Sequence, residues 1–77
     1  MVVHLKFFAG LREHLPREPS PYPTEVPDGA TVAQILTLYR VPLDKPKILL
    51  VNGRHASLDQ PLAHGDTLSV FPPVAGG

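Results

Sequence analysis

The first residues of the chain alternate between apolar and polar side chains. Single polar residues separate three apolar positions: Val3, Leu5 and Phe7. This period is typical of a strand that has one buried face and one open face. We therefore predict a strand over residues 2–8, with Phe8 on the face opposite to Phe7.

The next part of the chain is rich in proline. Residues 9–15 permit a helix of one or two turns, which must stop at Pro16 because proline lacks the N–H donor and disfavours a helical conformation in the residue before it. Alternation then returns only weakly, over residues 22–26, with prolines between the alternating positions. Because only an edge strand tolerates missing donors, we predict a proline-broken edge strand there.

One segment carries the signals of a substantial helix. Thr31 and Gln34 have the spacing of a capping box, in which two side chains satisfy free backbone N–H groups. Apolar residues then recur at helical intervals: Val32, Ile35, Leu36 and Tyr39. This pattern predicts one main helix that begins after Thr31 and ends before Pro42.

The last third of the chain predicts three strands. Residues 47–51 form a short apolar run between turn signals, which indicates a strand buried on both faces. Asn52-Gly53 is a strong signal for a tight hairpin turn, and a short strand is expected from Arg54. After a loop, residues 67–71 alternate again and predict a final strand that is central or well anchored in the sheet.

The order of these elements indicates the fold class. A main helix that follows two strands and packs across a mixed sheet gives a two-layer α+β domain of the β-grasp kind. We expect about four or five strands on one main helix. The expected domain covers residues 1–71, and residues 72–77 form a flexible C-terminal diglycine tail that projects from it.

Size and composition exclude several classes of function. A domain of 77 residues has no room for a deep catalytic cleft. Seven basic and seven acidic residues balance, so neither nucleic acid nor an anionic membrane is an expected partner. The absence of cysteine excludes disulfides and thiol nucleophiles. The four histidines lack the spacing of metal ligands and are expected at the surface, without a metal. The N-terminus resembles neither a signal peptide nor a membrane span, so a cytoplasmic location is expected.

The sequence finishes with the seven residues FPPVAGG. Gly76 and Gly77 have no Cβ, so they can enter a channel too narrow for any other residue. Behind them lie a stiff stem and two small apolar residues: Pro72, Pro73, Val74 and Ala75. Extended from Phe71, this tail reaches roughly 20 Å, and its prolines favour the extended form. The carboxylate of Gly77 is therefore the expected reactive group.

Several segments together resemble a known family. FFAGLRE at residues 7–13, VNG at 51–53, PLAHGDTLSVF at 61–71 and the terminal FPPVAGG resemble the small sulfur-carrier proteins of the ubiquitin superfamily. The likeness is greatest to the small subunit of molybdopterin synthase. The thiamine-pathway sulfur carrier also ends in two glycines, but FFAGLRE and the double proline are less like it.

The resemblance implies a chemistry for Gly77. An ATP- and magnesium-dependent adenylating enzyme of the ubiquitin-activating type would convert its carboxylate to an acyl-adenylate, and a persulfide donor would supply the sulfur of a thiocarboxylate. The tail would then enter the large catalytic subunit of molybdopterin synthase, in a two-to-two complex, and pass its sulfur to a pterin precursor in molybdenum cofactor biosynthesis. The chain itself would be a non-catalytic carrier that binds no cofactor.

Five residues outside the tail are candidate partner contacts. Phe8 and Phe71 are expected to form an apolar docking patch near the tail, although both residues packing in the core is an equally good interpretation. Arg12 and Glu13 lie within the FFAGLRE segment, where a solvated helix face explains them equally well. His55 stands where the synthase subunit tends to carry an apolar residue in its docking surface, so this chain departs from the family pattern there.

Other functions share the same tail. The chain could carry sulfur for another pathway, such as thiamine synthesis or tRNA thiolation. It could act as a ubiquitin-like modifier, in which a lysine amine attacks the activated Gly77 to form an isopeptide bond. It could also be a plain interaction domain whose tail is never activated.

Overall fold

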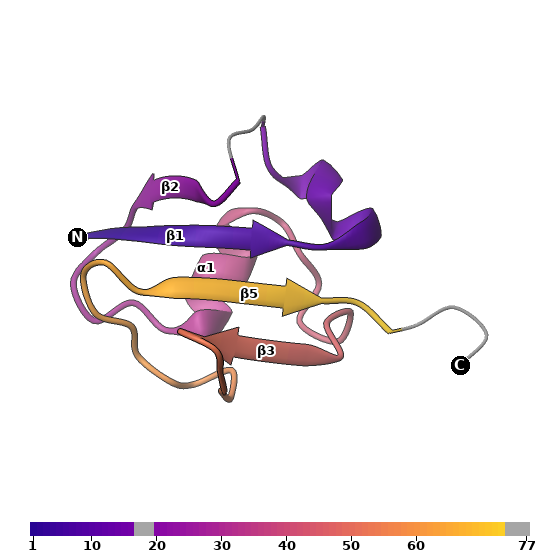
Figure 1. Ribbon diagram of the computed structural model, residues 1–77. Helices are drawn as coiled ribbons and strands as arrows, with labels where there is room; N and C mark the ends of the chain where they lie inside the picture. The colour runs from indigo at the N-terminus through magenta and orange to yellow at the C-terminus, as the bar shows by residue number, and fades with distance from the viewer. Residues whose placement is uncertain (17–19, 74–77) are drawn as a thin grey trace.

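The computed structural model describes residues 1–16 and 20–73. In these ranges five strands and two helices follow one another along the chain (Figure 1): β1 (Val2–Phe7), η1 (Ala9–His14), β2 (Tyr22–Glu25), α1 (Val32–Leu38), β3 (Ile48–Val51), β4 (Arg54–His55) and β5 (Thr67–Phe71). The predicted elements are all present. The short helix η1 is a 3₁₀ helix, and proline ends it as expected.

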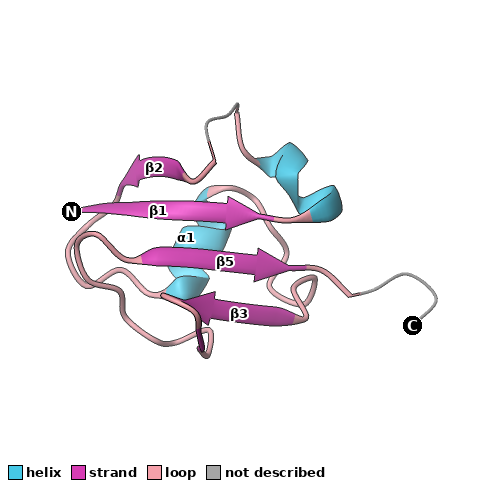
Figure 2. Ribbon diagram, in the orientation of Figure 1, coloured by secondary structure: helices cyan, strands magenta, loops and turns pink. Residues whose placement is uncertain are grey.

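The five strands form one mixed sheet in the order β2-β1-β5-β3-β4. The two longest strands, β1 and β5, are parallel neighbours at its centre, while the other pairings are antiparallel. Helix α1 lies behind the sheet in Figure 2, which leaves the other face of the sheet toward the viewer. The predictions of a mixed sheet on one main helix, of an edge strand at residues 22–26 and of a central last strand are therefore confirmed.

The core lies between the sheet and α1. The alternation of β1 and β5 places one set of side chains on this inner face, and all of them are buried: Val3, Leu5, Phe7, Leu68 and Val70. They pack against the apolar stripe of α1, at Val32, Ile35 and Leu36. Burial of apolar surface of this kind is the main force that stabilises a small domain.

The apolar run at residues 47–51 behaves differently from its prediction. It forms β3, but Ile48 is 39% exposed and Leu50 is only half-buried, while Val51 is buried. The expectation of a strand buried on both faces is therefore wrong. A run of apolar residues has no period, and here only one face of the sheet is covered by a helix.

Local signals explain both ends of α1. The side chains of Thr31 and Gln34 form the predicted capping box. At the other end, the Val41 N–H donates to the Leu36 carbonyl and the Arg40 N–H donates to the Thr37 carbonyl, which is the Schellman arrangement. Arg40 has a φ of 62°, in the left-handed region where glycine is the usual residue.

We expect the substitution Arg40→Gly to stabilise the domain by about 0.5–1 kcal/mol, because it removes the steric cost of a Cβ in this conformation and part of that gain is lost to the greater freedom of glycine in the unfolded chain. Urea unfolding followed by circular dichroism measures the difference. The matched control is Arg40→Ala, which removes the same charged side chain but keeps the Cβ and should give no gain. Equal stabilisation by both variants would show that the side chain, and not the backbone, was the source of strain.

Candidate functional site

The predicted tail leaves the domain at the end of the central strand β5. Phe71 is the last residue of that strand, Pro72 is half-buried and Pro73 is exposed. Figure 1 shows the chain running out beyond the sheet at this end, where β1 also ends and η1 follows it. The tail residues Val74, Ala75, Gly76 and Gly77 lie outside the described residues, so their proposed roles stay predictions.

Two phenylalanines meet at this exit. The rings of Phe8 and Phe71 stack with their centroids 4.2 Å apart and their planes within 4° of parallel. Phe8 is 37% exposed and Phe71 is half-buried. Phe7 points into the core, and Phe8, which directly follows β1 and is still extended, continues the alternation of the strand. The two residues therefore lie together on the open face rather than in the core, as the docking interpretation requires.

Ile48 extends this contact to the next strand, and the sequence reasoning missed it. It is the register partner of Phe71, and paired residues project from the same face of a sheet. Phe8, Phe71 and Ile48 thus form an apolar row across three strands, which we call the exit row. The signal that could have found Ile48 is the pairing register of β3 with β5, which no local pattern contains.

A second row crosses the same face one step away. Lys6 pairs with Ser69 in β5, Ser69 pairs with Leu50 in β3, and Leu50 pairs with His55 in β4. His55 is exposed and Leu50 is half-buried. The structure therefore brings His55 onto the same face as the exit row, but on the short outermost strand.

The charges on these strands are of one sign. Strands β1, β3, β4 and β5 contain no acidic residue, whereas they contain two basic residues and two histidines: His4, Lys6, Arg54 and His55. Lys47 directly precedes β3. Only His4, Lys6 and His55 of these residues share the open face, because Arg54 pairs with the buried Val51. Strand β2 adds Glu25 to this face, opposite Val2. The open face is thus apolar at the exit row, with Lys6 in the neighbouring row, which suits a partner surface that is mainly apolar and has a carboxylate near Lys6.

Arg12 and Glu13 are both exposed in η1. The one salt bridge within residues 1–16 and 20–73 joins the N-terminal ammonium to Asp28, so Arg12 has no acidic partner among them. Helix η1 lies against the ends of β1 and β5, because Leu11 is buried in the core. Arg12 therefore lies on a helix beside the point where the chain leaves the domain, but it is not part of the exit row.

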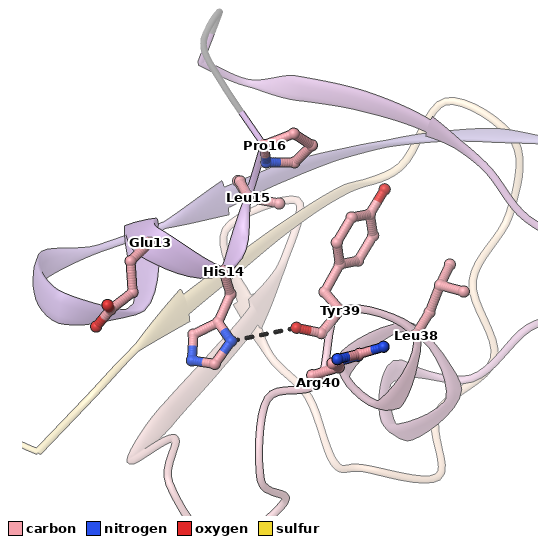
Figure 3. Close-up of a pocket in the computed structure, with 7 residues that line it drawn as sticks. All are labelled: Glu13, His14, Leu15, Pro16, Leu38, Tyr39 and Arg40. Carbon is pink, nitrogen blue, oxygen red and sulfur yellow. Dashed lines mark hydrogen bonds between the residues drawn. The ribbon is translucent and has the colours of Figure 1, made fainter.

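A hollow of about 260 Å³ lies between η1 and the end of α1. In Figure 3 the His14 imidazole points toward the backbone carbonyl of Tyr39, and its Nδ1–H donates to that oxygen at 3.2 Å. The carboxylate of Glu13 and the guanidinium of Arg40 point away from His14 in different directions. These charged groups do not converge on a common point, so the hollow has no arrangement suited to acid–base chemistry.

Only two of the four histidines are exposed. His55 and His64 are exposed as predicted, but His4 and His14 are half-buried, which corrects the prediction for these two. His64 is also engaged, because its Nδ1 accepts a hydrogen bond from the Val2 N–H at 3.0 Å. The hydrogen bonds of His14 and His64 both join segments that are far apart in the sequence, so the spacing of the histidines does not predict them.

Comparison with known proteins adds to this geometry. Residues 5–77 match the model of the ThiS family. The chain belongs to the ThiS family. No curated protein matches the sequence.

Several solved structures share the fold of this ThiS-family chain, among them the following three. SAMP1 from Haloferax volcanii is 27% identical, with a TM-score of 0.72 and all of both chains covered. A putative molybdopterin converting factor, subunit 1, from Pyrococcus furiosus is 29% identical, with a TM-score of 0.70, covering 95% of this chain and 98% of that one. In the complex of subunits 1 and 2 of molybdopterin-converting factor from Helicobacter pylori, the matching chain is 20% identical over all of both chains, with a TM-score of 0.58, and this likeness shows the fold alone.

The family and these neighbours confirm the predicted α+β fold of the β-grasp, ubiquitin-like kind. They also make this ThiS-family chain a ubiquitin-like sulfur carrier, a class of small proteins that generally has no catalysis of its own. Among the described residues, no helix is long and apolar enough to cross a membrane.

Proposed function

We propose that this chain carries sulfur as a thiocarboxylate on Gly77 and donates it in molybdopterin biosynthesis. The observation that carries the proposal is the exit of the chain from the central strand β5 at Phe71, directly beside the apolar exit row. An enzyme that docks on this row holds the start of the tail at a defined place. The likeness to the Pyrococcus furiosus subunit supports molybdopterin as the pathway.

The chemistry needs two partners with different roles. In the first, an adenylating enzyme with ATP and magnesium, a carboxylate oxygen of Gly77 attacks the α-phosphorus of ATP and pyrophosphate leaves. A persulfide sulfur then attacks the acyl carbon and AMP leaves, which gives an acyl disulfide. A second thiol cleaves its S–S bond, becomes a mixed disulfide with the donor, and leaves the thiocarboxylate on Gly77. The carrier supplies only the acyl group, so the lack of cysteine is compatible with this scheme.

The second partner would be the large catalytic subunit of molybdopterin synthase, in a two-to-two complex. The complex known for the Helicobacter pylori protein makes such a partner a reasonable proposal for a chain of this fold. Both partners would contact the exit row of Phe8, Phe71 and Ile48. Lys6, in the neighbouring row of the same face, favours a carboxylate on the partner surface, and Arg12 on η1 and His55 on β4 are further proposed contacts.

A second function shares the activated glycine. The likeness to SAMP1, a small archaeal modifier protein, supports conjugation as the alternative. In that case a lysine amine of a target protein attacks the Gly77 acyl carbon, AMP leaves and an isopeptide bond forms. The two functions use the same adenylate and differ only in the nucleophile that follows.

Intact-mass spectrometry tests the proposal. The full chain is incubated with the adenylating enzyme, magnesium-ATP, a persulfide donor and a thiol, and we expect a species in which one oxygen is replaced by sulfur. Omission of ATP should prevent this change. The product is then added to the large subunit with a pterin precursor, and loss of the sulfur with formation of the dithiolene product is expected. An unchanged mass contradicts carriage, and covalent adducts on lysines of other proteins instead of sulfur transfer favour the modifier.

A further inference from the structure

The exit row contains one contact that differs from an ordinary apolar patch. Phe8 and Phe71 are stacked flat, with a centroid distance of 4.2 Å and an angle of 4°. We infer that Phe8 is a positioning residue, which fixes the direction in which the chain leaves β5 and thereby sets the rate at which Gly77 is activated. The inference rests on the proposed function, and it assigns to Phe8 a role beyond docking.

The backbone around Phe71 is held on both sides up to this point. The Lys47 N–H donates to the Phe71 carbonyl at 2.7 Å, and the Phe8 N–H donates to the Val70 carbonyl at 3.0 Å. The next residue, Pro72, has no N–H and cannot continue either ladder. The ring of Phe8 against the ring of Phe71 is therefore the last side-chain stack that orients the chain before it leaves the sheet.

Phe8 is itself held firmly in place. Ala9 has a φ of 53°, a left-handed conformation that an alanine adopts only where the surrounding structure requires it. This turn begins η1, in which the Leu11 N–H donates to the Phe8 carbonyl at 3.1 Å and the Leu11 side chain is buried. The backbone of Phe8 is therefore held in place, and its ring acts as a fixed support for the ring of Phe71.

A small change of direction at Phe71 has a large effect at the end of the tail. For a tail that is extended over roughly 20 Å when it is bound by the enzyme, a tilt of about 15° at Phe71 moves the tip by about 5 Å. A misplacement of about 1 Å of reacting atoms can already lower a rate about a hundredfold. Loss of the stack should therefore lower kcat, because fewer bound carriers present the carboxylate correctly. Loss of a contact that acts equally before and during the reaction raises KM instead.

The test measures ATP–pyrophosphate exchange by the adenylating enzyme as a function of the concentration of the full-length carrier. For Phe8→Ala we expect kcat to fall about tenfold while KM changes less than about threefold. Phe8→Tyr keeps the flat ring and should restore kcat. The matched control is Ile48→Ala, which removes a side chain of similar exposure from the same face, is the register partner of Phe71 and takes no part in the stack. It should raise KM and leave kcat unchanged.

The possible results distinguish a failure of the positioning role of Phe8 from a failure of the proposed function. If Phe8→Ala raises KM with kcat unchanged, as expected for Ile48→Ala, Phe8 is a docking contact only and the positioning role is overturned. If the wild-type chain supports no exchange, the proposed function fails and this inference falls with it. Thermal unfolding confirms that each variant is folded. Should Phe8→Ala be unfolded, Phe8→Leu takes its place, because leucine keeps the apolar volume but cannot form a flat stack, and the same fall in kcat is expected.

Discussion

Deletion of Gly77 is expected to abolish adenylation of the carrier. The remaining carboxylate, on Gly76, would stop roughly 3.5 Å short of the reacting position, and even a smaller displacement removes most of the rate. The free energy of unfolding should change by less than about 0.5 kcal/mol, because the buried core ends with Val70 in the part of the chain that the structure describes. ATP–pyrophosphate exchange and urea unfolding measure the two effects.

The control for this deletion is Val74→Ala, which keeps the length of the tail and both terminal glycines. It should leave most of the adenylation activity in place. A marked loss of thermal stability on deletion of Gly77 would mean that the tail is part of the fold, and the proposal of a projecting reactive terminus would then be wrong. Full activity after the deletion would equally remove Gly77 from the chemistry.

Leu68→Ala is expected to destabilise the domain by about 2–5 kcal/mol. Leu68 is fully buried in the central strand β5, between β1 and β3 and beneath α1. Removal of its side chain takes away buried apolar surface and leaves a cavity. The flanking strands cannot move in to fill it without breaking their backbone hydrogen bonds to β5. Because small domains are stable by only about 5–15 kcal/mol, this loss is a large fraction of the total free energy of unfolding. Urea unfolding gives the difference directly.

The matched control is Leu38→Ala in the last turn of α1. Leu38 is 57% exposed, so the same chemical change should cost no more than about 0.5 kcal/mol. A similar loss for both variants would show that burial in the sheet is not the source of stability. A loss below about 1 kcal/mol for Leu68→Ala would show that the core can collapse around the missing side chain.

Local signals in the sequence predicted most of the fold. The period of β1, the capping box at Thr31 and the Asn52-Gly53 turn all depend on residues that are close in the chain. In the structure, Asn52 and Gly53 have φ values of 53° and 84°, the left-handed pair that this dipeptide adopts easily in a tight hairpin. Each of these predictions is confirmed because its cause lies within a few residues.

The candidate site was predicted less completely. The sequence favours a docking patch at Phe8 and Phe71 no more than a place for both in the core, and it predicts a strand buried on both faces around Ile48. Its exposure depends on whether a helix or loop covers the outer face of β3, and nothing near residue 48 in the chain contains that information. The same limit applies to His14, whose hydrogen bond to the Tyr39 carbonyl joins η1 to the residue that directly follows α1.

The sequence by itself determined the composition of the tail, the alternation of the strands and the ends of the main helix, because these follow from single residues and short spacings. Only the tertiary structure decided which face of the sheet stays open and which side chains meet there. Pairing of β5 with β1 on one side and β3 on the other places Phe8, Phe71 and Ile48 in one row at the exit of the chain. That row depends on long-range register, which is set by the packing of the whole core and not by any short segment.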